Sequence, residues 1–246
     1  MIQNDFKQDY VIRYSEIDFD KSLKLFSLLN FLQDTASDNA EKLGFGYSYI
    51  TPKNLMWVLL KYRIEFSEYP VDIKNLIINT EPRGYNRLFA YRDFEISVDN
   101  KLIGRAFTMW SLVDFTNMTI ANVEKALNGN PYMKKFEAKE DDLSFEKIPQ
   151  IERVDFEKEF EVRYNDIDVN RHANNGNYIV WAFEPLSFEF KTSHKPKTID
   201  MFFKKEAKFG EKLISKVQLT DEKTTVHVIQ HAETGEDLCL LQCKWS

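Results

Sequence analysis

The sequence predicts an α+β fold made of two similar halves, each with a helix packed against an antiparallel sheet. A repeated motif supports this prediction, because RYSEIDFD at residues 13–20 and RYNDIDVN at residues 163–170 share Arg-Tyr, an acidic residue and Ile-Asp. A repeated order of elements supports it as well, since a strand and a helix precede four longer strand-like segments in both halves. A chain of 246 residues is long enough for two domains that each bury a core.

The first half is expected to begin with a short strand at Tyr10–Glu16 and to continue with one amphipathic helix. Its apolar residues recur at the three- and four-residue spacing of a single helix face; they are Leu25, Leu28, Leu29, Leu32, Ala36, Ala40 and Leu43. Gly44 and Gly46 follow as stop signals, which gives a helix of about five turns. Strands are then expected at residues 54–66, 71–82, 88–98 and 101–115, with a turn at Asp99-Asn100.

The second half repeats this order. Residues 159–168 read as a strand and residues 175–184 as a helix. The expected strands that follow are residues 198–209, 211–220, 224–232 and 237–245, and Pro70 and Gly210 lie at matching breaks between the first two long strands of each half.

A long helix followed by an antiparallel meander can bury its apolar stripe and the inner face of the sheet if the sheet curls around it. This is the hotdog arrangement, and two copies in one chain predict a tandem (double) hotdog with two antiparallel sheets, each wrapped around a long helix. Residues 128–155 contain NGNP and a charged run and read as a connector. We therefore expect one domain in residues 1–150, connector included, and a second in residues 151–246.

The composition is that of an ordinary globular protein, with 43% hydrophobic and 29% charged residues. A net charge of −6 argues against nucleic acid as a partner, because phosphate binding requires clustered Lys and Arg. The N-terminus shows no signal or transit peptide and no apolar run reaches the roughly 20 residues of a membrane span, so we expect a cytoplasmic protein. Cys239 and Cys243 would lie about 13 Å apart on an extended strand, too far for a disulfide, and are expected to be buried thiols.

Chemistry is indicated where the second copy of the motif departs from the first. Asp168, Asn170 and His172 alternate along a segment read as extended, so their side chains would share one face. Asn174 and Asn175 are good N-cap residues, and the helix start would add unpaired amide donors of the kind found in an oxyanion site. Asp18, Asp20 and Ser22 occupy the matching positions of the first copy. Turn and capping hydrogen bonds with a surface histidine are the alternative interpretation.

The run DVNRHANNGNYIVWAFE resembles the signature of the plant and bacterial acyl-acyl carrier protein thioesterases of the FatA/FatB type, in which D-x-N-x-H-x-N-N leads into Y-I-x-W and an acidic residue. WVLLKYRIEF and MWSLVDFTN in the first half resemble further patterns of the family, so the resemblance covers nearly the whole chain. It implies hydrolysis of a fatty acyl thioester on acyl carrier protein. We expect no cofactor and no metal, because the lone His172 with Asp168 and Glu206 lacks the close ligand spacing of a zinc site.

The resemblance also implies a catalytic glutamate on the strand after the second helix, which is Glu206 here, within a network of Asp168, Asn170 and His172. Many plant members carry a cysteine directly after that glutamate, and this chain has Ala207, so a cysteine nucleophile at that position is excluded. Glu206 with His172 would deprotonate water. Direct attack by Asp168 is the alternative route, and a solvent-facing role is the alternative for Glu206.

The first half is expected to supply a tunnel for the acyl chain. The candidate lining residues, each of which could also be plain core, are Met56, Trp57, Leu59, Phe26, Phe31 and Phe45. Lys204, Lys205 and Lys208 could attract the acidic carrier protein or merely protect a strand edge. An acyl-CoA thioesterase, a hotdog dehydratase and a non-catalytic acyl-binding protein are the alternative functions, and exposed sheet edges would allow a homodimer.

Overall fold

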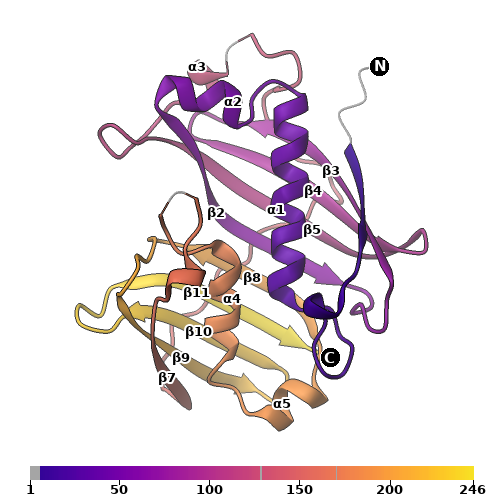
Figure 1. Cartoon of the computed structure of the whole chain (residues 1–246), viewed down its shortest axis with the longest axis vertical. Helices are drawn as coiled ribbons and strands as arrows, with labels where there is room; N and C mark the ends of the chain where they lie inside the picture. The colour runs from indigo at the N-terminus through magenta and orange to yellow at the C-terminus, as the bar shows by residue number, and fades with distance from the viewer. Residues whose placement is uncertain (1–5, 128, 170) are drawn as a thin grey trace.

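The computed structural model describes residues 6–127, 129–169 and 171–246, in which two helix-and-sheet halves lie one above the other (Figure 1). The N-terminal half comprises β1 (Phe6–Val11), α1 (Leu25–Lys42), α2 (Tyr47–Ile50), β2 (Leu55–Phe66), β3 (Asn75–Tyr85), β4 (Phe89–Val98), β5 (Lys101–Asp114), β6 (Thr119–Ile120) and α3 (Val123–Ala126). The C-terminal half comprises β7 (Phe156–Glu161), α4 (Asn175–Phe183), α5 (Phe188–Ser193), β8 (Pro196–Phe203), β9 (Lys212–Asp221), β10 (Thr224–His231) and β11 (Asp237–Trp245). Short 3-10 turns lie at Tyr14–Glu16, Thr51–Lys53 and Tyr164–Asp166.

The predicted double hotdog is confirmed, and its two sheets join into one. The strand order is β1-β3-β4-β5-β2-β8-β11-β10-β9-β7, with β6 paired to β5. The junction is the antiparallel pairing of β2 with β8, which is fastened by an ion pair between Arg63 Nη1 and Asp200 Oδ2 at 2.5 Å. Because α1 and α4 lie on the same side of this sheet and contact each other, both halves contribute to one main core (Figure 1).

The helix α1 forms where the apolar periodicity predicts it. Its 18 residues bury a face that includes Leu28, Leu32 and Ala36 against the N-terminal sheet, since residues three or four apart share a helix face. The chain leaves the helix through Gly44, whose φ of 75° lies in the left-handed region that glycine adopts without strain. The second helix, α4, has 9 residues and is half as long.

Several expected strand boundaries were wrong. The strand expected at residues 159–168 is Phe156–Glu161, and the one expected at residues 71–82 is Asn75–Tyr85. The first strand is Phe6–Val11, whereas Tyr14–Glu16 forms a 3-10 turn closed by a hydrogen bond from the Arg13 amide to Glu16 Oε2 at 2.7 Å. The strand expected at residues 198–209 is Pro196–Phe203. Its regular pairing ends where the Lys204 and Lys205 amides both donate to the Leu238 carbonyl of β11, at 2.8 and 3.2 Å. Cys239 and Cys243 on β11 are free and buried, as predicted.

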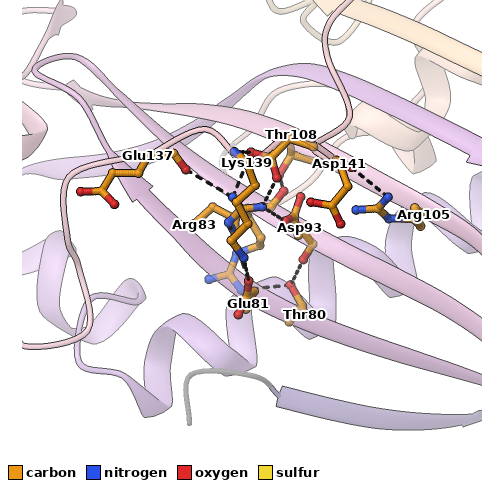
Figure 2. Close-up of polar contacts among 11 residues, drawn as sticks. Thr80, Glu81, Arg83, Asp93, Arg105, Thr108, Glu137, Lys139 and Asp141 are labelled. Atoms are coloured by element: carbon orange, nitrogen blue, oxygen red, sulfur yellow. Dashed lines mark hydrogen bonds and ion pairs between the residues drawn. The ribbon is translucent and has the colours of Figure 1, made fainter. Parts of the chain in front are cut away.

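The connector crosses the outer face of the N-terminal sheet. Arg83 on β3 pairs with Asp93 on β4 and with Asp142 of the connector, and Figure 2 shows Glu137, Lys139 and Asp141 lying over these strands. None of the helices in the described part of the chain combines the length and the apolar character that a membrane crossing requires.

Candidate active site

The segment that carries Asp168 and His172 is a tight loop and not the extended strand that its alternation suggested. Ile167 and Ala173 form an antiparallel bridge, and the Asp168 amide donates to the His172 carbonyl at 2.8 Å. The loop closes because Arg171 adopts a left-handed φ of 66° and donates its amide to the Asp168 carbonyl at 3.0 Å. Asn170, also predicted for the site, lies outside the described residues.

Asp168 supports this loop through its side chain. Its Oδ1 accepts a hydrogen bond from the His172 amide at 3.3 Å, a geometry in which a carboxylate satisfies a backbone donor within a turn. Asp168 and His172 therefore lie close together because the chain folds back between them.

His172 and Glu206 are the predicted pair that the fold brings into direct contact. His172 Nδ1 lies 3.0 Å from Glu206 Oε2, and their side chains are 21% and 37% exposed. Glu206 lies three residues beyond the end of β8, in the bend that follows the strand and not on the strand as expected.

The bend that carries Glu206 is tied to the loop and to α4. The Ala207 amide donates to Tyr178 Oη at 2.7 Å, and the Ala207 carbonyl accepts from the Ala173 amide at 2.9 Å. Ala207 itself is buried. The neighbouring Glu206 is thereby anchored against the loop of His172. We predicted no role for Tyr178 from the sequence. The available signal for this contact was its place in the motif, one turn into α4.

Burial is the main electrostatic influence on Glu206. Desolvation raises the pKa of Glu206, nearby His172 and Lys208 act in the opposite direction, and Asp168 adds to the increase. The net effect is an increase, so the ionised carboxylate is a stronger base than an exposed glutamate. A carboxylate with a raised pKa beside an imidazole is a common arrangement for general acid-base chemistry.

The start of α4 faces the same pocket. Asn174 is the N-cap, as predicted, and its side chain accepts from the Gly176 amide at 2.7 Å, whereas Asn175 is the first helical residue. A Cβ on Gly176 would lie 3.0 Å from the Phe26 ring, so glycine allows α4 to approach α1 closely here.

A pocket of about 100 Å³ joins these groups to the N-terminal half. Asp168, His172, Asn175, Tyr178 and Glu206 line it together with Trp110 on β5 and residues 56–60 of β2. The site therefore lies between the two halves.

A second, more apolar cavity of about 70 Å³ shares two tryptophans with this pocket, since Trp57 and Trp110 line both spaces. The rest of its wall comes from α1, the loop after α1, β3, β4 and the connector, and includes Ala36, Ala40, Phe45, Pro82, Ala90, Arg92 and Met133. Among the expected tunnel residues, Met56, Trp57 and Leu59 line the first pocket, Trp57 and Phe45 line the second, Phe31 packs in the core, and Phe26 lines a different cavity.

Two of the three lysines near Glu206 are paired with carboxylates of β11 and the turn before it. Lys204 Nζ lies 2.8 Å from Asp237 Oδ2, and Lys205 pairs with Glu236. These pairs reduce the positive field that Lys204 and Lys205 would offer an acidic partner. The charge of Lys208 opposes the increase that burial causes in the pKa of Glu206.

The corresponding loop of the first half makes the same backbone contacts at its described residues. Ile17 and Leu23 form the bridge, the Asp18 amide donates to the Ser22 carbonyl at 2.9 Å, and Lys21 has a left-handed φ of 66°. The Leu23 amide donates to the Pro70 carbonyl at 3.0 Å, as the Ala173 amide does to Ala207.

Comparison with known proteins agrees with this architecture. Residues 3–129 match the acyl-ACP thioesterase N-terminal domain, and residues 150–246 match the acyl-ACP thioesterase C-terminal domain. The chain is 22% identical to oleoyl-acyl carrier protein thioesterase 2, chloroplastic, from Arabidopsis thaliana over 98% of this chain and 76% of that protein. It covers a smaller share, 62%, of an acyl-[acyl-carrier-protein] hydrolase from Cuphea viscosissima.

Solved structures share the fold. An acyl-ACP thioesterase from Bacteroides thetaiotaomicron superposes with a TM-score of 0.86 at 23% identity, covering 99% of this chain and 98% of that one. The 12:0-ACP thioesterase from Umbellularia californica superposes with a TM-score of 0.87 at 19% identity, covering 100% and 98%. The double hotdog of this chain is thus the fold of these proteins.

Proposed function

The chain belongs to the acyl-ACP thioesterase family, and we propose from this that it hydrolyses the thioester of a fatty acyl chain on acyl carrier protein. The products are the free fatty acid and the carrier thiol, and the reaction ends growth of the acyl chain. The observation that carries the proposal is the 3.0 Å contact of His172 with Glu206 in a pocket that meets an apolar cavity at Trp57 and Trp110.

Glu206 and His172 act as the base in this mechanism. They take a proton from a water molecule whose oxygen attacks the thioester carbonyl carbon. The resulting oxyanion is stabilised by donors at the start of α4, where Asn175 lines the pocket, and Asn170 stays a predicted donor. The carbon–sulfur bond then breaks, and the thiolate takes up the proton that the pair had accepted. Loss of such a base lowers the rate by about 10² to 10⁴.

Asp168 has a positioning role in this proposal, because its Oδ1 accepts the His172 amide and so holds the loop. This favours the general-base route over direct attack by Asp168, in which the same carboxylate would form an anhydride with the acyl group.

We assign the acyl chain to the N-terminal domain, residues 1–150, and the reacting groups to the C-terminal domain, residues 151–246. The two domains place their contributions on either side of one pocket. Acyl carrier protein is the proposed partner. A cytoplasmic location and a homodimer stay predictions of the sequence.

The test is release of free thiol and free fatty acid from a panel of acyl carrier protein and coenzyme A thioesters. Wild type should cleave the carrier protein substrates, and Glu206→Gln and His172→Ala should lose at least about a hundredfold in kcat/KM. Circular dichroism and thermal unfolding of each variant check that the fold is intact. Wild type that cleaves no thioester, or folded variants that cleave as well as wild type, would contradict the proposal. Faster cleavage of coenzyme A thioesters would assign a different carrier.

A further inference from the structure

Three arginine side chains of this molecule are buried in or against the sheet, and one of them differs from the other two. Arg63 pairs with Asp200 and Glu65. Arg83 pairs with Asp93, and both are labelled in Figure 2. Arg83 also pairs with Asp142. Buried guanidinium groups are normally compensated in this way, because removing a charge from water is costly. Arg92 has no carboxylate partner within the described residues.

Arg92 points inward from β4 toward α1. It is 5% exposed, and its Nη1 donates to Asn39 Oδ1 at 2.7 Å and to Thr80 Oγ1 at 3.2 Å, both neutral acceptors. Among residues 6–127, 129–169 and 171–246, no acceptor bonds its Nε or Nη2, although a guanidinium has five N–H donors. The side chain lines the apolar cavity that Trp57 and Trp110 also line.

The charge of Arg92 is retained in this setting. Burial lowers the pKa of Arg92 to about 9, so the guanidinium is protonated at neutral pH. Asn39 lies in the last turn of α1, where the partial negative charge of the helix end offsets part of the cost of burial. This compensation explains how the cation is tolerated. It leaves the Nε and Nη2 donors of this cavity-lining side chain without a protein partner among the described residues.

A cavity built only for a hydrocarbon chain gains nothing from a cation in its wall. A donor in a cavity wall that has no protein partner favours a ligand that brings an acceptor over one that does not. Trp57 and Trp110 line both this cavity and the pocket of His172 and Glu206, and we therefore assign the distal part of the acyl chain to this cavity.

We infer that Arg92 is a specificity residue that binds an oxygen substituent on the distal part of the acyl chain, so that this enzyme prefers oxygenated acyl thioesters to plain saturated ones. The recognised chemistry is an acceptor oxygen, as in a hydroxyl, oxo or terminal carboxylate group. The inference rests on the proposed thioesterase function, which supplies the orientation of the chain.

The test compares kcat/KM for saturated acyl carrier protein thioesters with chains of equal length that carry a hydroxyl, an oxo group or a terminal carboxylate at stepped distal positions. Wild type should prefer at least one oxygenated chain by about tenfold to a hundredfold, the range of a hydrogen bond to a charged group. The three substituents distinguish a preference for neutral oxygen from a preference for an anion.

Two variants assign the preference to Arg92. Arg92→Met removes the donor, and Asn39→Asp leaves the arginine in place but gives it a carboxylate. Both should bring the ratio of oxygenated to saturated kcat/KM toward one, and because the ratio is taken within each variant, a general loss of activity cancels. Should Arg92→Met fail to fold, the wild-type ratio and Asn39→Asp decide the matter.

The result that overturns the inference is a wild-type ratio of one or less for every oxygenated chain, or an unchanged ratio in the variants, with saturated thioesters cleaved well. That outcome leaves the thioesterase function intact. If no thioester is cleaved, the proposed function fails instead. Calorimetric binding of matched hydroxy and saturated fatty acids to Glu206→Gln, with and without Arg92→Met, then judges Arg92 independently of turnover.

Discussion

The two loops that start at Ile17 and Ile167 make the same backbone contacts at their described residues and differ in their side chains. Each is closed by one antiparallel bridge and one left-handed residue, with the same φ of 66° in both. In each the first aspartate accepts the amide four positions later, at 3.2 Å in the first loop and 3.3 Å in the second. The duplication has therefore kept the turn, which both halves need, and the aspartate that holds it.

The reactive groups are what the first loop lacks. Ser22 occupies the place of His172, and Tyr69 occupies the place of Glu206, where its hydroxyl donates to the Leu23 carbonyl at 2.6 Å. Asp20 pairs with Lys195, so its charge is neutralised locally. The comparison separates architecture from chemistry: Asp168 resembles Asp18 in its visible role, and His172 with Glu206 has no equivalent.

Exchanging His172 and Ser22, which lie four positions after Asp168 and Asp18, should have the largest effect on kcat/KM. His172→Ser gives the second loop the side chain of the first and should lower kcat/KM by about a hundredfold or more, because the partner of Glu206 is lost. Ser22→His is the matched control and should leave thioester hydrolysis near the wild-type rate, since no carboxylate corresponding to Glu206 lies beside it. Thiol release under identical conditions measures both. Equal losses in the two variants would mean that the loops contribute alike.

The pH dependence should show the burial of Glu206. A base must be ionised to accept a proton, and burial raises the pKa of Glu206, so the acid limb of kcat/KM should fall above the ordinary glutamate value of about 4.3. Below that limb, activity should drop about tenfold for each pH unit. Initial rates between pH 4 and pH 9 check this, with Tyr69→Phe in the first half as the matched control. A limb at or below the ordinary value would assign the base to another group.

The raised pKa of Glu206 also predicts how stability changes with pH. As pH rises through this pKa, activity should increase and the free energy of unfolding should decrease. The native state binds the Glu206 proton more tightly than the unfolded chain does, so stability falls as pH rises from the unfolded pKa through the raised native one. Glu206→Gln should therefore raise the free energy of unfolding at pH 7 and lose this advantage below about pH 4. Urea unfolding at both pH values measures it, and Glu222→Gln on an exposed turn is the control. A destabilised Glu206→Gln at pH 7 would show that the carboxylate mainly holds the loop.

The sequence predicts the repeated elements better than the site between them. The apolar spacing from Leu25 to Leu43 defines α1, and Arg-Tyr with Ile-Asp reveals the duplication, because these signals lie within a single segment. The closure of the loop at Arg171 was not predicted, since alternating polar residues suit a strand equally well and the left-handed residue is not a glycine. The neutral partners of Arg92 were not predicted, because they lie on other elements, Asn39 on α1 and Thr80 on β3.

The smallest expected effect concerns how the two loops lead into their helices. Asn174 caps α4 with its side chain, whereas Lys24 occupies the N-cap of α1 without a side-chain hydrogen bond. Asn174→Ala should cost about 1 kcal/mol of unfolding free energy, and Lys24→Asn should stabilise the protein by a similar or smaller amount. Denaturant unfolding measures both. If Asn174→Ala also lowers kcat far more than stability at the assay temperature explains, the cap is needed to hold the start of α4 at the reacting carbonyl, and the second loop differs from the first in that respect too.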